Sequence, residues 1–128
     1  MIVEVVGAVI RDAEGRLLTV RKRGTSHFML PGGKPEPGED DFTALARELS
    51  EEIGVDLVSA TLLGEFEAAA ANEPGATVRS HAYLVEIEGE IAIQAEIEDL
   101  RWIDPARPPE VPIAPLLAAC ILPALAEG

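Results

Sequence analysis

The 128-residue sequence contains little cysteine, few aromatic side chains and no long apolar run. Its single cysteine, Cys120, excludes an internal disulfide and fits a reducing compartment, so we expect a cytoplasmic protein. Aromatic residues make up only 4% of the chain, and the core must therefore consist mainly of Val, Ile, Leu and Ala. No apolar run reaches the roughly 18 residues of a transmembrane helix, so we expect no membrane association.

Basic residues are also scarce, because 10 Lys and Arg stand against 23 Asp and Glu, giving a formal net charge of −13. This excess of negative charge argues against a nucleic-acid-binding protein. The basic residues are nevertheless grouped: Arg21, Lys22, Arg23 and Lys34 fall within one short stretch. The first four residues read as the start of a strand and lack the basic segment of a signal peptide.

The length and the residue pattern predict a single domain over residues 1–128. Strands are expected at 3–10, 17–22, 55–71, 77–87, 91–93 and 99–104, with the first two forming a hairpin around the turn at 12–15. One helix is expected from about residue 40 to Gly54, and a second at 114–126, kinked or shortened by Pro123. These elements predict an α+β sandwich whose helices cover a mixed sheet. The apolar stretch 113–125 fits a buried helix or a dimer contact, which leaves both monomer and homodimer open.

The first expected helix carries three glutamates on one side. Glu48, Glu51 and Glu52 fall within an arc of roughly 100° on the helix, a crowding of like charges that a cation would offset. A neighbouring apolar stripe, able to anchor the helix to a core, consists of Phe42, Leu45, Leu49 and Ile53. A rigid cluster of carboxylates suits hard divalent cations, so we expect Mg²⁺ or Mn²⁺.

The spacing of this region is distinctive. Gly33 is followed after five residues by Glu39, and after seven more by Arg47-Glu48-Leu49-Ser50-Glu51-Glu52-Ile53-Gly54-Val55. In this pattern the chain resembles the Nudix hydrolases, the superfamily that includes the MutT-type pyrophosphohydrolases. The resemblance implies an α/β/α sandwich with a mixed central sheet. It also implies a metal-dependent hydrolase that cleaves a pyrophosphate bond in a nucleoside diphosphate derivative.

The same resemblance assigns roles to residues of the motif. Glu48 and Glu52, with Glu51 adjoining them, are the expected metal ligands, and the backbone carbonyl of Gly32 should complete part of the shell. Structural support is expected from Gly33, Glu39, Arg47 and Gly54. Among these, Arg47 should form an ion pair that holds the glutamates, and Glu39 should bind a further metal or orient a water.

The catalytic base remains open between two regions of the chain. The glutamates of the motif, Glu48, Glu51 and Glu52, are one source. The other is Glu96, which best matches an acidic loop position of MutT-type relatives, with Glu98 and Asp99 as neighbouring competitors.

The motif indicates a chemistry and leaves the substrate open. Arg21, Arg23 and Lys34 are candidates for phosphate contacts or ordinary surface charges, and His27 either stacks on a base or lies at a loop edge. The compact length favours a (deoxy)nucleoside triphosphate, oxidised or normal, cleaved to monophosphate and pyrophosphate. The alternatives are ADP-ribose or a nucleotide sugar as substrate, and a non-catalytic nucleotide-sensing module, which the intact set of carboxylates disfavours.

Overall fold

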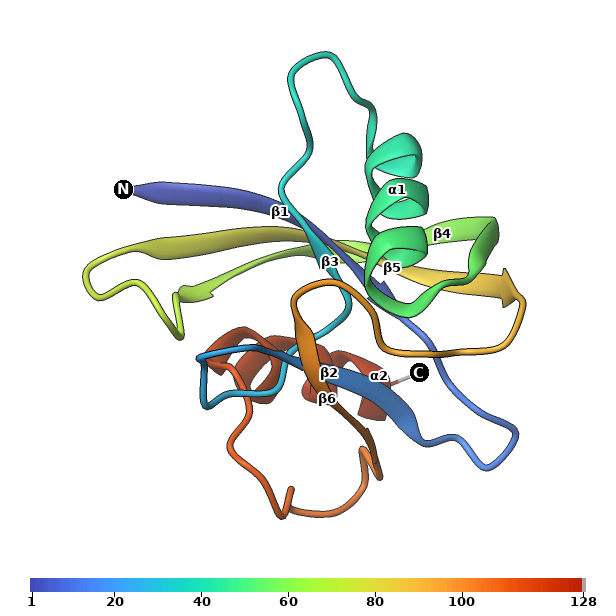
Figure 1. Cartoon of the computed structure of the whole chain (residues 1–128). Coiled ribbons are helices and arrows are strands. Elements are labelled where there is room, and N and C mark those ends of the chain that lie inside the picture. The colour runs from blue at the N-terminus through green and yellow to red at the C-terminus, as the bar shows by residue number, and fades with distance from the viewer. Residues whose placement is uncertain (128) are drawn as a thin grey trace.

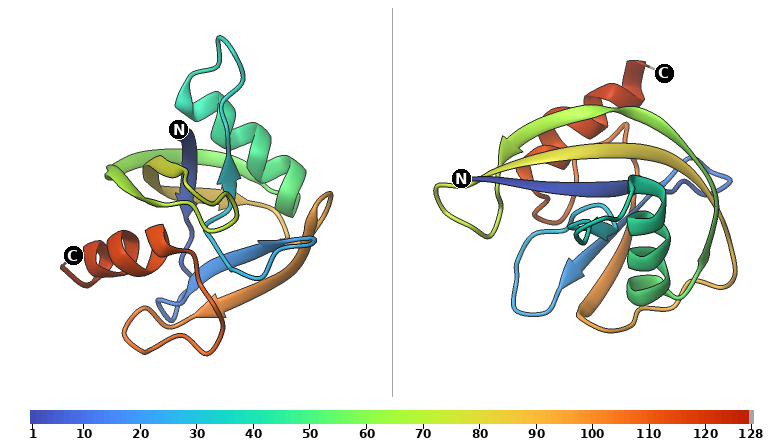
Figure 2. Two further views of the ribbon diagram at one scale, coloured as in Figure 1. Left: turned by 90° about the vertical axis from the view of Figure 1, so that its left-hand side faces the viewer. Right: turned by 90° about the horizontal axis from the view of Figure 1, so that it is seen from above.

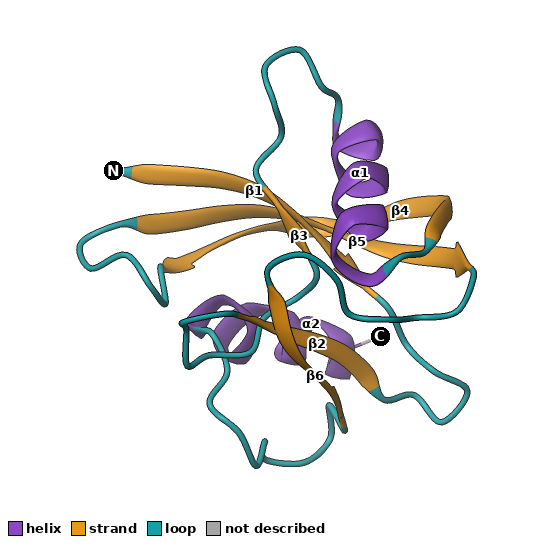
Figure 3. Cartoon of the chain, viewed as in Figure 1, coloured by secondary structure: helices purple, strands orange, loops and turns teal. Residues whose placement is uncertain are grey.

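The computed structural model describes residues 1–127, which form a mixed sheet with helices on both of its faces (Figures 1 and 3). The strands are β1 (Ile2–Val9), β2 (Leu17–Lys22), β3 (Gly32–Gly33), β4 (Asp56–Ala69), β5 (Thr77–Glu88) and β6 (Ile97–Ile103). The helices are α1 (Asp41–Ile53), the π-helical turn η1 (Leu117–Ile121) and α2 (Leu122–Glu127).

Two sheets make up the centre of the molecule. The four-stranded sheet has the order β3-β1-β5-β4, in which β1 runs parallel to β5 and the other neighbours are antiparallel. Strands β2 and β6 form a separate antiparallel pair. Figure 2 shows α1 on one side of the four-stranded sheet and the terminal helix on the other. The expected α+β sandwich with a mixed sheet is confirmed.

The alternation of side chains along β1 explains why both faces are covered. Val6 and Ala8 point to the side of α1 and pack in one cluster with its Leu45 and Leu49. Val9 points the other way, into a second cluster that contains Leu117 and Ile121 of the terminal helix. The core is aliphatic as expected from the composition, with Phe28 as a buried aromatic addition.

The expected hairpin of the first two strands is wrong. The turn at 12–15 does form, and one bridge joins Arg11 to Leu17. Both edges of β1, however, are taken by β3 and β5, so no edge is left for β2. Strand β2 pairs with β6 instead.

Two smaller expectations are also wrong. Residues 91–93 form no strand, because Ala92 and Gln94 donate their backbone N–H groups to the carbonyls of Ile53 and Glu52 at the end of α1. Phe42 is not part of the anchoring stripe, since it lies in the first turn of α1 and is 47% exposed. The segment 91–94 therefore serves to close the C-terminal end of the helix that carries the glutamates.

The terminal helix continues through Pro123. Pro123 has no backbone N–H to donate, and the preceding turn widens to π-helix, with Leu122 N–H bonding Leu117 O. Leu117 and Ile121 are buried against the sheet. This placement agrees with the buried-helix alternative for the apolar stretch 113–125.

Candidate active site

Helix α1 holds its glutamates in place because both ends of the helix are capped. At the start, the Asp40 side chain accepts a hydrogen bond of 2.8 Å from the Thr43 N–H. At the end, Gly54 adopts a left-handed conformation with φ 69° and donates its N–H to Ser50 O. A helix fixed in this way presents its polar side in one orientation.

Two glycines bring the preceding loop against the carboxylates. A Cβ on Gly33 would lie 2.7 Å from the Glu48 carboxylate, and a Cβ on Gly32 would lie 2.0 Å from Val6 O. Gly32, at φ 146°, donates its N–H to Glu52 Oε1 at 3.1 Å. Any side chain at either position would separate β3 from α1 or β1.

Glu52 is the unusual member of the cluster, because it is only 5% exposed. The pKa of Glu52 is raised to about 8, chiefly by burial and also by the neighbouring Glu48 carboxylate. The Gly32 N–H and the positive charge of Lys22 oppose this shift in pKa. A buried carboxylate beside a second one is a site that a cation would stabilise strongly.

Arg47 ties the acidic groups together. Its guanidinium donates two hydrogen bonds of 2.8 Å to Glu39 and one of 2.7 Å to Glu48. The same side chain reaches the Lys34 carbonyl at 3.2 Å. The guanidinium lowers the pKa of Glu39 to about 2, and the two carboxylates raise the pKa of Arg47. This is the geometry that a supporting role for Arg47 and Glu39 requires.

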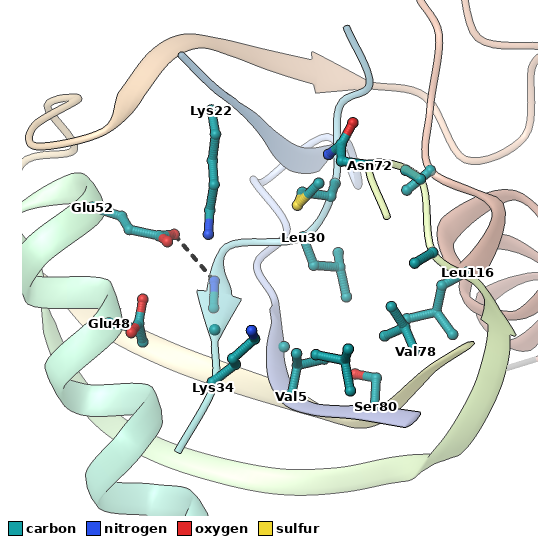
Figure 4. A pocket seen from close by; sticks show the side chains of 18 of the residues that line it. Val5, Lys22, Leu30, Lys34, Glu48, Glu52, Asn72, Val78, Ser80 and Leu116 are labelled. Atoms are coloured by element: carbon teal, nitrogen blue, oxygen red, sulfur yellow. Dashed lines mark hydrogen bonds between the residues drawn. The ribbon is translucent and has the colours of Figure 1, made fainter. Parts of the chain in front are cut away.

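A cavity of about 660 Å³ opens beside these groups, and Figure 4 shows part of its lining. One end is charged and the other is apolar, formed by the sheet face away from α1 together with the terminal helix. The expected site residues that line it are Gly32, Gly33, Lys34, Arg47, Glu48, Glu51, Glu52 and Glu96. Residues far apart in sequence, on β3, α1 and the turn before β6, therefore share one space.

Other expected residues lie outside the described lining of this cavity. Arg21 donates to Thr25 O at 2.8 Å and stacks over the Phe28 ring at 5.8 Å. Arg23 contributes its backbone N–H to the Glu96 carbonyl at 2.7 Å, and so holds the turn that carries Glu96. His27 Nδ1 lies 3.0 Å from Ser26 Oγ, at a loop edge.

Lys22 is a cavity residue that was not among the expected site residues. A signal for it was present in strand alternation: Leu18 and Val20 face the core under α1, and Lys22 continues that side of β2. This signal is easily missed, because Lys22 stands between Arg21 and Arg23. The charge pattern alone does not show which of the three side chains points toward the cavity.

The donor set fits a magnesium ion whose coordination shell is completed by phosphate oxygens of the substrate. Within residues 1–127, no three carboxylate, imidazole or thiol groups converge closely enough to hold a metal ion. Glu48 is engaged by Arg47, and the Glu51 side chain is 57% exposed. Magnesium commonly binds through one or two carboxylates together with waters and substrate phosphates, which matches the pair of Glu48 and Glu52 beside an open cavity.

Comparison with known proteins defines the class of this fold and site. The family model for the NUDIX domain matches residues 1–123, and the chain therefore belongs to the Nudix hydrolases, enzymes that act on phosphoric anhydride bonds. It is 32% identical over 119 residues to the CTP pyrophosphohydrolase of Escherichia coli (strain K12), covering 88% of this chain and 84% of that protein.

Two further relatives support the same assignment. The 8-oxo-dGTP diphosphatase of Haemophilus influenzae is 39% identical over 70 residues, which cover 52% of each chain. The crystal structure of a MutT Nudix hydrolase from Burkholderia pseudomallei superposes with a TM-score of 0.77 at 27% identity, covering 95% of each chain. Among the described residues 1–127, no helix is both long and apolar enough to cross a membrane.

Proposed function

We propose that this Nudix pyrophosphohydrolase converts a (deoxy)nucleoside triphosphate, normal or oxidised, to the monophosphate and pyrophosphate. The observation that carries the proposal is the buried Glu52 beside Glu48 at the charged end of a cavity whose other end is apolar. A nucleoside triphosphate has the matching polarity, with phosphates at one end and a base at the other. The names of the two curated relatives, CTP pyrophosphohydrolase and 8-oxo-dGTP diphosphatase, support a triphosphate substrate.

Different residues have different roles in this reaction. Glu48 and Glu52, with Glu51 and the Gly32 carbonyl, would hold Mg²⁺ or Mn²⁺, which supplies charge neutralisation and lowers the pKa of a bound water. Lys22 and Lys34, both in the cavity lining, bind phosphate oxygens.

The proton of the attacking water goes to a carboxylate that lines the cavity, either a motif glutamate (Glu48, Glu51 or Glu52) or Glu96. Glu48 is held by Arg47, whereas Glu96 lies on the turn before β6, beside Ala95 at φ 52°. Replacing Glu96 with Gln should lower kcat by about 100-fold if it is the base. Glu98→Gln is the matched change, because Glu98 meets Arg21 and does not belong to the described lining. Full activity of Glu96→Gln would assign the base to the motif.

The decisive experiment is a hydrolysis screen with product identification, with Mg²⁺ and with Mn²⁺. The panel contains normal and oxidised nucleoside triphosphates, ADP-ribose, nucleotide sugars and dinucleotides. We expect pyrophosphate and a monophosphate as products, and a loss of several orders of magnitude in Glu52→Gln. Glu86→Gln, an exposed change on β5, should keep wild-type activity.

Other results would contradict the proposal in distinct ways. AMP plus ribose 5-phosphate as the preferred products would replace the triphosphate by ADP-ribose. Turnover that survives in a folded Glu52→Gln variant would reject the assigned role of Glu52. Absence of turnover across the panel would favour a nucleotide-sensing module.

A further inference from the structure

Apart from the exposed Asn72, the apolar end of the cavity offers few polar groups that could tell one base from another. Its walls include Val5 of β1, Val78 of β5 and Leu116 of the terminal helix. No aromatic side chain contributes to the lining that residues 1–127 provide. Aliphatic walls hold any flat ring by dispersion and burial, so a preference among bases requires a polar group.

Ser80 supplies a polar group in this part of the lining. It lies on β5 opposite Val5 of β1, and Figure 4 shows the two side chains together. Ser80 is only 1% exposed, and none of the hydrogen bonds found among residues 1–127 uses its hydroxyl. The residue nevertheless belongs to the cavity lining, and its oxygen is not among the fully buried side-chain atoms that lack a partner. A hydroxyl in this setting lacks a partner that a ligand can provide.

Gly7, which has no side chain, lets the Leu30 side chain lie close to this hydroxyl. A Cβ at Gly7 would lie 3.5 Å from Ser80 Oγ and 3.2 Å from Leu30 Cδ1. A glycine inside a strand forgoes side-chain packing, and such positions often mark a close approach of a ligand. The three residues Gly7, Leu30 and Ser80 therefore lie together in the cavity lining, and this part of the wall is hereafter called the Ser80 notch.

The Ser80 notch lies at a suitable distance from the phosphate end. Gly7 pairs with Gly32, whose N–H meets the Glu52 carboxylate. Ser80 is on the next strand beyond β1, so two strand spacings, about 10 Å, separate it from β3. A nucleotide with its phosphates near Glu52 can reach the notch with its base.

We propose that the Ser80 hydroxyl hydrogen-bonds the polar edge of the nucleotide base and sets the base preference of the enzyme. This inference rests on the proposed function, because it assumes a nucleotide in the cavity. A hydroxyl can donate to a ring nitrogen or carbonyl and accept from an amino group, so it reads the base edge and ignores the phosphates. Ser80 is then a specificity-determining residue with no part in the chemical step.

The test separates base recognition from hydrolysis by measuring binding of products. Dissociation constants of AMP, GMP, CMP and UMP are determined calorimetrically with Mg²⁺ for wild type, Ser80→Ala and Ser59→Ala. Ser59 is an exposed serine on β4 and provides the same chemical change away from the cavity. We expect Ser80→Ala to weaken binding of the tightest-binding monophosphate about three- to tenfold. The four dissociation constants should also differ less from one another than in wild type. Ser59→Ala should leave all four constants unchanged.

A second variant approaches the same notch from β1. Gly7→Ala keeps the hydroxyl but places a methyl group in front of it, and should narrow the spread of the four constants as Ser80→Ala does. Thermal unfolding monitored by circular dichroism confirms that each variant is folded. The ratio of kcat/KM between the best and the worst triphosphate should fall by a similar factor in both variants, with kcat for the best substrate little changed.

The inference and the proposed function fail in different ways. If no triphosphate is hydrolysed but Ser80 still sets the spread of monophosphate binding, the proposed function falls and the inference stands. The inference is overturned if the four dissociation constants differ as much in Ser80→Ala as in wild type. It is also overturned if the wild type binds all four monophosphates equally.

Discussion

At the scale of single residues, the site depends on a carboxylate that is buried away from water. Glu52 is buried beside Glu48, and burial raises its pKa to about 8. The Gly32 N–H and Lys22 compensate part of this unfavourable placement. The buried carboxylate therefore has the character of a functional group that lowers the stability of the metal-free protein.

Removing this charge should stabilise the metal-free protein. Glu52→Gln retains an oxygen that can accept from the Gly32 N–H but carries no charge beside Glu48. We expect its free energy of unfolding at pH 8 in EDTA to exceed that of wild type by on the order of 2 kcal/mol. Urea denaturation measures the difference. Glu51→Gln, at a largely exposed side chain, should change stability little, and a less stable Glu52→Gln would show that the carboxylate is not strained.

At the scale of the elements, helix α1 is connected at both ends to groups distant in sequence. Near its start, Asp41 accepts from His81 Nδ1 at 2.8 Å and from the Tyr83 hydroxyl, while His81 Nε2 lies 2.9 Å from Glu65 on β4. Its end is closed by Gly54 and by the backbone of residues 92 and 94. The orientation of the glutamates therefore depends on β4, β5 and the loop before β6.

The start of α1 should respond to pH through His81. Hydrogen bonds to Asp41, and secondarily to Glu65, raise the pKa of His81 above 6.5. Because the pKa is higher in the folded than in the unfolded protein, this stabilisation is complete below about pH 6.5 and is lost as pH rises through the folded value.

The measurement compares wild type with His81→Gln by urea denaturation at pH 5.5 and pH 9. The advantage of wild type should be about 1 kcal/mol or less at pH 5.5, given the partial exposure of His81, and smaller at pH 9. His27→Gln is the matched control, since His27 contacts a neighbouring serine rather than α1. An advantage that grows with pH would contradict the expected role.

The end of α1 should be sensitive to the backbone conformation of Gly54. An alanine there must adopt φ near 69°, which is unfavourable for a residue with a Cβ, and its Cβ would displace the flexible end of Gln94. We expect Gly54→Ala to lower the free energy of unfolding by about 1 kcal/mol. Gly54→Asn should recover part of the loss, because Asn tolerates this conformation. Equal stability of the glycine and alanine proteins, measured by urea denaturation, would contradict this view.

At the scale of the whole molecule, a formal charge of −13 is combined with a cavity that must receive an anionic substrate. Self-repulsion of this kind destabilises a compact state, and ions in solution reduce it. Two effects of magnesium should therefore be distinguishable: general screening, which any salt provides, and binding at the glutamates of α1.

Thermal unfolding in MgCl₂ and in NaCl at equal ionic strength separates these effects. We expect Tm to rise in both salts and to rise further in MgCl₂, by several degrees at millimolar concentration. In Glu52→Gln the two salts should give nearly the same Tm. An equal response of wild type to both salts would show that screening alone acts on the folded protein.

The local pattern of the sequence determined much of this protein, because helix periodicity acts over a few residues. It placed Glu48, Glu51 and Glu52 on one side of α1, ended that helix at Gly54 and required an aliphatic core. The glycines before the helix were also recognisable from their spacing.

Only the tertiary structure decided which distant segments meet. Strand β2 pairs with β6 because β1 has no free edge. Lys22 lines the cavity, whereas Arg21 and His27 lie outside its described lining. The tertiary structure also placed Ser80, an unremarkable strand serine in the sequence, beside Gly7 within the cavity. Strand partners are chosen by packing across the whole sheet, a long-range free energy that no short stretch of sequence contains.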